Sequence, residues 1–188
     1  MKFAVTIART YGSGGKEIGR KLAKRLGTSY YGRDGIITTE NEALLSDDES
    51  IRFSSSIAGS EINHSKAREL FAEQSADMER LADRESCVFV GRCSDYVLRD
   101  RPNVIKIFIF ASERSCMRRV MRLYELNPDE AKEIIRAMNK SRSEYYHFHT
   151  GLDRNNALHY DLCINVSDMD TDTVADFLAD IVRHRLEL

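Results

Sequence analysis

Residues 4–20 read AVTIARTYGSGGKEIGR, and this stretch decides the fold more than any other. A short apolar run leads into a glycine-rich turn, and a basic residue then opens an amphipathic helix in which Ile18, Leu22 and Leu26 share one face. Glycines let the turn approach a ligand closely, and the helix directs unpaired N–H groups and its positive dipole end at the turn. We therefore predict a cradle for the phosphates of a nucleoside triphosphate. Its residues are Gly12, Ser13, Gly14, Gly15, Lys16 and Glu17.

The predicted cradle departs from the usual P-loop pattern, G-x-x-x-x-G-K-[ST]. Aligned without gaps on residues 12–14, Gly15 takes the place of the phosphate-binding lysine and Lys16 that of the hydroxyl that supports Mg²⁺. One inserted glycine restores Lys16 to the lysine position, but Glu17 then follows without a hydroxyl. Arg9, beside the loop, is a second candidate for the missing charge. A turn that serves packing alone is the alternative, and we favour the phosphate loop because strand, glycines, cation and helix follow in the required order.

Composition is that of one soluble globular domain. The chain has 188 residues, of which 42% are hydrophobic and 31% charged, and its net charge of −2 gives no general attraction to nucleic acid or anionic membranes. No signal-peptide core follows Met1-Lys2, and no apolar run is long enough to span a membrane. The cysteines show no C-x-x-C pair and are expected to be buried thiols in a reducing cytoplasm. They are Cys87, Cys93, Cys116 and Cys163.

Strand and helix patterns alternate along the chain. Apolar runs predict buried strands at residues 3–8, 87–90, 104–110 and 162–166, with a short fifth at 29–31. Between these runs apolar residues recur with the spacing of a helix, and Asn127-Pro-Asp-Glu130 is typical of a helix start. The last helix is expected to bury a stripe of apolar residues. That stripe consists of Val174, Phe177, Leu178, Ile181 and Val182. The alternation predicts a doubly wound α/β domain, with residues 45–65 as a surface insertion over the acceptor site.

Several phrases occur in a familiar order: the loop, Gly27-Thr-Ser-Tyr-Tyr31, Val90-Gly-Arg92, and R-x-x-Y-Y-x-x-x-T-G at residues 142–151. With these phrases the chain resembles the cytidylate kinase-like family of P-loop nucleoside monophosphate kinases. The resemblance implies a three-layer P-loop kinase fold, in which helices cover both faces of a five-stranded parallel sheet of order 2-3-1-4-5. It also implies an acceptor-binding helical segment at about residues 33–84 and a helical lid at about residues 118–151.

The chain departs from the classical members at two further sites. Gly91-Arg92-Cys93 stands where they have G-R-D, which removes the aspartate beside the acceptor. The lid pattern R-D-x-x-D-x-x-R corresponds to residues 135–142, which read IRAMNKSR, so that only the last arginine is retained and Asn139 replaces the inner aspartate. The resemblance therefore indicates the fold more firmly than the substrate.

The expected site residues divide into three groups. The phosphate loop holds the donor. The acceptor is held by residues near the ends of the second and third strands, namely Tyr31, Arg33, Asp34, Arg92 and Asp95. The catalytic cations are Lys16, Arg9, Arg118 and Arg142. Arg118 is chosen among four arginines of the helix after Phe110, because a lid-base arginine is usual there in the superfamily. Arg142 is expected beyond the helix that starts at Asn127, in a mobile arm ending near Gly151.

The leading hypothesis is phosphoryl transfer from ATP to a small acceptor, such as the nucleoside monophosphate CMP. Mg²⁺ would arrive on the nucleotide phosphates, with water as its other main ligand. His147, His149 and His159 lack the spacing of a metal site, so no protein-bound metal is predicted. The alternatives are a kinase of a non-nucleotide metabolite and a catalytically weak module that senses nucleotides. Small-molecule nucleotides are the expected partners, without nucleic acid or membrane, and the sequence does not indicate the oligomeric state.

Overall fold

The computed structural model describes residues 2–32, 35–37 and 64–187. Its strands are β1 Ala4–Arg9, β2 Ser29–Gly32, β3 Gly35–Ile37, β4 Cys87–Val90, β5 Val104–Phe110 and β6 Leu162–Asn165. Its helices are α1 Gly15–Leu26, α3 His64–Arg84, α4 Ser94–Val97, α5 Glu113–Tyr124, α6 Pro128–Thr150 and α7 Thr171–Leu186, with a 3-10 turn, η1, at Ala157–His159. The predicted insertion at 45–65 lies almost wholly outside the described residues.

The strands form one sheet in the order β3-β2-β4-β1-β5-β6. All pairings from β2 to β6 across the sheet are parallel, so these five strands have the predicted order 2-3-1-4-5. The short strand β3, which was not predicted, pairs antiparallel with β2 at the edge. In the centre, Ile7 of β1 lies opposite Val90 of β4 and Ile107 of β5. Because parallel strands end at one edge, the segments after β1 and β4 leave from neighbouring positions, where ligands bind in such folds.

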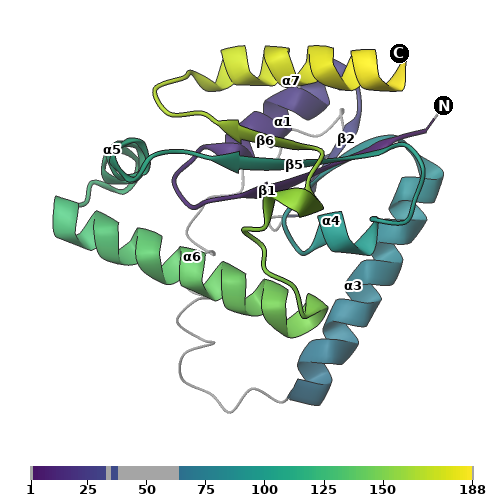
Figure 1. Ribbon diagram of the computed structural model, residues 1–188, viewed down its shortest axis with the longest axis horizontal. Helices are drawn as coiled ribbons and strands as arrows, with labels where there is room; N and C mark the ends of the chain where they lie inside the picture. The colour runs from purple at the N-terminus through teal and green to yellow at the C-terminus, as the bar shows by residue number, and fades with distance from the viewer. Residues whose placement is uncertain (1, 33–34, 38–63, 188) are drawn as a thin grey trace.

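Helices cover both faces of the sheet (Figure 1). On one face α1 and α7 pack together, and Leu22 and Leu178 join the sheet residues Val5 and Ile107 in the largest hydrophobic cluster. On the other face a smaller cluster contains Met78 of α3, and α3, α4 and α6 lie on this side (Figure 1). The architecture is therefore the predicted three-layer arrangement.

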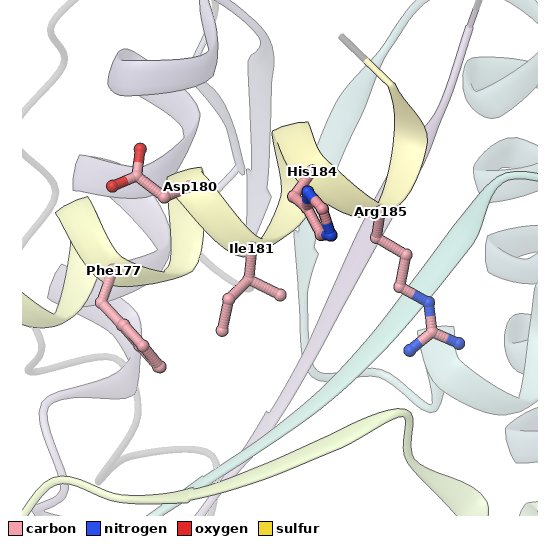
Figure 2. Close-up of a pocket in the computed structure, with 5 residues that line it drawn as sticks. All are labelled: Phe177, Asp180, Ile181, His184 and Arg185. Atoms are coloured by element: carbon pink, nitrogen blue, oxygen red, sulfur yellow. The ribbon is translucent and has the colours of Figure 1, made fainter.

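The apolar stripe of α7 is narrower than predicted. Val174, Leu178 and Val182 are fully buried, whereas Phe177 is 49% exposed. Figure 2 shows Phe177 and Ile181 on α7 in a hollow that is also lined by Asp180, His184 and Arg185. The sequence interpretation was wrong for Phe177 because five apolar residues within nine positions span more than one helix face. No residue of the phosphate loop lines this hollow.

Helix α6 is one unbroken element of 23 residues. Its start is the predicted one: the Asn127 side chain accepts hydrogen bonds from the backbone N–H groups of Asp129 and Glu130, and the Glu130 carboxylate accepts from Asn127 N–H. The helix ends only at Gly151, which is left-handed with φ 72°. The expectation that Arg142 lies beyond this helix in a separate arm was wrong, because no helix-breaking residue occurs before Gly151.

Cysteine burial matches the prediction at three of the four positions. Cys87, Cys93 and Cys116 are buried, whereas Cys163 is exposed. Cys163 lies on β6 at the edge of the sheet, where alternate side chains face outward. Within the part of the chain that the structure describes, no helix has both the length and the apolar character needed to cross a membrane.

Candidate active site

The predicted phosphate loop connects β1 to α1. Gly12 and Gly14 have φ of 81° and 83°, a left-handed backbone that favours glycine. Gly14 is the N-cap of α1 and has no side chain to occupy the first N–H groups, which stay directed at the loop. Buried Ser13 closes the turn by donating a hydrogen bond from Oγ to the Thr10 carbonyl at 2.9 Å. Lys16 is the second residue of α1, so a cation stands in the first helical turn, as in a P-loop.

Helix α5 packs directly against this loop. A Cβ on Gly12 would lie 2.9 Å from Cβ of Cys116, and one on Gly14 would lie 2.8 Å from Cζ of Arg119. The guanidinium of Arg119 therefore covers the glycine at the start of α1. Arg118, the arginine chosen from the sequence, instead pairs with Asp168 and has a side chain that is 57% exposed. The structure thus places Arg119, and not Arg118, beside the loop.

Glu17 joins the loop helix to two other helices. Its Oε1 accepts hydrogen bonds from Thr171 Oγ1 at 2.6 Å and pairs with Lys21 at 2.9 Å, while Oε2 pairs with Arg119 at 3.0 Å. Burial alone would raise the pKa of Glu17, but the hydrogen bonds from Thr171 and Lys21 and the nearby Arg119 charge together lower it. Both carboxylate oxygens are thus engaged by α1, α5 and α7, which leaves the loop without a first-turn oxygen of the usual Ser/Thr kind.

Arg9 reaches from the loop to the neighbouring strand end. A Cβ on Gly15, the first residue of α1, would lie 2.7 Å from Cβ of Arg9. A Cβ on Gly91, just after β4, would lie 2.1 Å from Nη1 of the same arginine. The two glycines provide the space for this side chain, so the Arg9 cation lies between the phosphate loop and the segment that follows β4.

The segment after β4 has an unusual backbone. Gly91, Arg92 and Cys93 have φ of 82°, 58° and 56°, so three consecutive residues are left-handed, two of them without the freedom of glycine. This turn leads into α4, where Asp95 is buried. Cys93, which replaces the classical aspartate, is itself buried, and burial raises the pKa of its thiol. The nearest carboxylate after this turn is thus that of Asp95, two residues beyond Cys93.

Asp95 is bound by Tyr146 of α6. The Tyr146 hydroxyl donates to Oδ2 of Asp95 at 2.7 Å, and the two residues are only 3% and 5% exposed, respectively. Burial raises the pKa of the Asp95 carboxyl, and the Tyr146 hydrogen bond lowers it in part. Burial likewise raises the pKa of Tyr146. This contact connects the turn after β4 to the predicted lid helix.

Three residues on one face of α6 hold it against the two strand ends. Asn139 Oδ1 accepts a 2.8 Å hydrogen bond from Tyr11 N–H, and Arg142 Nη1 donates to the Arg9 carbonyl at 3.2 Å. The Arg142 guanidinium also lies 5.3 Å from the centre of the Tyr11 ring. With Tyr146, these residues follow the i, i+3, i+7 spacing of one helix face. Sequence reasoning selected Arg142 but missed the contacts of Asn139 and Tyr146.

A second arginine meets the same carbonyl group. Arg154 follows α6 and donates from Nη1 to the Arg9 carbonyl at 3.1 Å, although its side chain was not among the predicted site residues. It is buried and has no periodic or motif context in the sequence. Its position between α6 and η1 became apparent only from the fold.

Of the remaining acceptor candidates, Tyr31 lies on β2. Tyr31 stacks on Phe89 with ring centres 5.2 Å apart, and its hydroxyl donates to Glu85 Oε1 at 2.8 Å. Hydrogen bonds from Ser29, Arg84 and Tyr31 lower the pKa of Glu85 to about 2. Arg92 stands in the turn after β4, as described. Arg33 and Asp34 lie outside the described residues.

The histidine pair of α6 has an aromatic setting. His149 stacks on Phe71 of α3 with ring centres 4.2 Å apart and also contacts Tyr145 and Phe148. Among the residues that the structure describes, no group of three or more His, Cys, Asp or Glu side chains could hold a metal ion.

The topology and the glycine-rich β1–α1 loop define the class of protein as a P-loop kinase fold. The chain belongs to the cytidylate kinase-like family, whose sequence profile matches residues 4–168. No curated protein shows significant similarity to it.

Solved structures share this fold. An uncharacterized protein from Eubacterium ventriosum has a TM-score of 0.74 and 24% identity, over 96% of this chain and 98% of that one. A shikimate kinase from Acinetobacter baumannii in complex with shikimate has a TM-score of 0.54 and 13% identity, covering 98% and 95% of the two chains. A gluconokinase from Sinorhizobium meliloti has a TM-score of 0.52 and 16% identity, covering 98% and 94%. Membership of the kinase-like family supports phosphoryl transfer as the general chemistry.

Proposed function

We propose that this protein transfers the terminal phosphoryl group of ATP to a small acceptor bound beside the ends of β2 and β4, and that nucleoside monophosphates such as CMP are the first acceptors to consider. The observation that carries the proposal is the course of Arg9, which packs on Gly15 of the loop and on Gly91 after β4. A cation between the donor and acceptor sides is positioned to stabilise charge on a transferring phosphoryl group. A cytoplasmic location, with small molecules as partners, belongs to the same proposal.

The donor would bind at the loop. The left-handed glycines and the uncapped start of α1 support a role as a cradle for the phosphates of ATP, and Lys16 adds a cation in the first turn. Mg²⁺, when bound with ATP, would offset negative charge on the phosphates. Because both Glu17 oxygens are engaged by other side chains, the ligands of the Mg²⁺ ion would come mainly from phosphate and water.

The acceptor would bind between the strand ends and α6. Arg92 and Asp95, with Tyr31 and the predicted residues Arg33 and Asp34, would hold it, while Arg142 approaches from α6. On α5 we now favour Arg119 over Arg118 as the arginine that serves the transferring group, because Arg119 covers Gly14. Such chemistry needs two anions in line and positive charge around them more than it needs covalent catalysis. Whether residues 118–151 act as a closing lid stays a prediction.

A non-nucleotide acceptor is the second candidate. Cys93 replaces the classical aspartate and the Asp95 carboxylate is bound by Tyr146, so the polar groups offered to an acceptor would differ from those of the classical members. A kinase for a small hydroxylated metabolite is consistent with that change. Glu17 also lacks the hydroxyl that supports Mg²⁺ in a P-loop, which favours as a further alternative a protein that binds ATP without turnover.

Two glycine variants test the role of Arg9. Gly91→Ala adds a Cβ that collides with the Arg9 guanidinium, whereas Gly27→Ala adds one at a similar left-handed backbone, φ 64°, with no atom within 4 Å. In both variants an alanine must adopt a left-handed backbone, which lowers the folding stability by roughly 1 kcal/mol. Only Gly91→Ala also displaces Arg9. We expect at least a tenfold fall in kcat for Gly91→Ala and less than a twofold change for Gly27→Ala. Equal activities would remove Arg9 from the proposed mechanism.

The activity itself is measured by ADP release in a coupled assay. The acceptors are CMP, dCMP, UMP, AMP, shikimate and a panel of hydroxylated metabolites, each with ATP and Mg²⁺. Turnover confined to nucleoside monophosphates supports the first proposal, and turnover confined to metabolites supports the second. ATP binding by calorimetry without turnover on any acceptor favours the sensing module.

A further inference from the structure

Arg154 is a buried cation that none of the roles described so far uses. Its side chain is 6% exposed and lies 5.9 Å from the centre of the Phe108 ring on β5. Its backbone is fixed as well, because Tyr160 donates a 2.8 Å hydrogen bond from its hydroxyl to the Arg154 carbonyl. The guanidinium is therefore held in one place beneath the carboxyl end of β1.

The guanidinium of Arg154 forms no direct ion pair within the described ranges. Among the described residues no carboxylate pairs with it, and its one side-chain hydrogen bond goes from Nη1 to the neutral carbonyl of Arg9. Its Nε is buried and has no acceptor among the residues that the structure describes. A guanidinium remains protonated in proteins, so burial without an anion is unfavourable unless a ligand supplies one. Burial lowers the pKa of Arg154, and the nearby groups Tyr160, Asp95 and Asp153 oppose that shift.

The position of Arg154 specifies where that anion would lie. Arg142 donates to the same Arg9 carbonyl, so the two guanidinium groups converge on one oxygen. The hydrogen bond from Tyr146 to Asp95 joins the helix that carries Arg142 to α4. A planar guanidinium is suited to bind two oxygens of a phosphate or carboxylate at once.

We infer that Arg154 binds an oxyanion of the acceptor and thereby restricts the enzyme to negatively charged acceptors. The inference rests on the proposed function, since it places the acceptor at this edge of the sheet. The competing explanation is structural: Arg154 would simply tie the segment after α6 to β1 through the Arg9 carbonyl.

Stability separates these two explanations. In Arg154→Met a buried unpaired cation is replaced by an apolar chain, and the Arg9 carbonyl keeps its hydrogen bond from Arg142. We expect this variant, in phosphate-free buffer, to melt at or above the temperature of the wild type. A structural tie predicts a clear loss of melting temperature instead. The matched control is Arg185→Met on α7 (Figure 2), which removes an exposed arginine. That arginine pairs with Asp161.

Binding provides the second readout. Inorganic phosphate is titrated by calorimetry into protein whose loop is filled with a non-hydrolysable ATP analogue. We expect the affinity for phosphate to fall at least tenfold in Arg154→Met, to fall less in Arg154→Lys, which keeps the charge, and to change less than twofold in Arg185→Met. Unchanged phosphate affinity in Arg154→Met, or no phosphate binding by the wild type, would overturn the inference.

The two proposals fail separately. If the ATP analogue does not bind, the proposed function fails, and phosphate titrated into empty wild type and Arg154→Met still decides the role of Arg154. If the analogue binds equally to both proteins while phosphate does not distinguish them, only the role of Arg154 fails. Displacement of phosphate by CMP would identify a phosphate monoester as the oxyanion, and displacement by shikimate a carboxylate. Both of these outcomes support the assignment.

Discussion

Replacing Tyr146 with phenylalanine removes one hydroxyl group from the buried contact between α6 and α4. That hydroxyl donates to Asp95 Oδ2 at 2.7 Å, and both residues are almost fully buried. Hydrogen bonds to charged groups contribute about 1.5–3 kcal/mol, so we expect Tyr146→Phe to lower the free energy of unfolding by roughly 2 kcal/mol at neutral pH. For a chain of this length the melting temperature should fall by about 4–8 °C.

The loss should depend on pH. Burial raises the pKa of Asp95 above its ordinary value of 3.8, so the folded protein holds this proton more tightly than the unfolded chain. The resulting stability is fully present below pH 3.8 and is lost as the pH rises through the folded-state pKa. Removing the Tyr146 hydroxyl raises that pKa further, and each unit costs about 1.36 kcal/mol once the carboxyl is ionised. The penalty of Tyr146→Phe should therefore grow from acid to neutral pH.

Urea denaturation of the wild type and Tyr146→Phe between pH 4.5 and pH 8 measures this penalty. Tyr96→Phe is the control, because Tyr96 lies on α4 and its ring faces Arg99, 4.0 Å away, without a hydrogen bond to Asp95. The reasoning is refuted if Tyr146→Phe costs no more than Tyr96→Phe. A penalty that stays constant across this pH range would also refute it.

Two further carboxylate and histidine contacts give pH-dependent predictions. Hydrogen bonds from Ser29, Arg84 and Tyr31 hold the pKa of Glu85 at about 2. The contribution of Glu85 to folding stability is therefore fully present above pH 4.5 and is lost as the pH falls through the folded-state pKa of about 2. Glu85→Gln should thus lower the unfolding free energy by about 1–2 kcal/mol at pH 7, after allowance for solvent screening, with a gap that closes toward pH 2 in urea titrations; a constant gap would contradict this. Burial, together with Arg68, lowers the pKa of His149, so the stability from its stack on Phe71 is present above pH 6.5 and is lost as the pH falls through the folded-state pKa. Hydrogen exchange in α3 should accelerate between pH 7.5 and 5.5, after correction for intrinsic rates, in the wild type but not in His149→Phe, and identical responses would show that His149 is not responsible.

The features that could be predicted from sequence are those fixed by neighbouring residues. The cap of α6 depends on Asn127, Pro128 and Glu130 alone, so its start was predicted correctly. The glycine turn between β1 and α1 is equally local, and the apolar runs of β4 and β5 give the strand bounds directly. Strand order came from the family resemblance, and the structure confirms it.

The remaining site features depend on how distant elements meet. Arg118 and Arg119 are adjacent, and a rotation of about 100° between them decides which faces the loop; only the packing of α5 on Gly12 and Gly14 settles it. Asp95 and Tyr146 are 51 positions apart, and Arg154 is a single residue in an irregular segment. No periodicity connects such residues, so their convergence could not be predicted without the fold.

The Glu17 contacts have a consequence for biosynthesis. Thr171, which binds Glu17, lies 154 positions further along the chain, and the partners of Lys21 and Arg25 on α7 are similarly distant. A ribosome that adds about 5–20 residues per second needs roughly 8–30 s to deliver α7 after α1 has emerged. Until then the nascent chain lacks the helix that covers α1 and neutralises its charges. Helix α1 is therefore translated well before the helix that secures it, so a chain interrupted before residue 171 lacks the α7 partners of Glu17, Lys21 and Arg25.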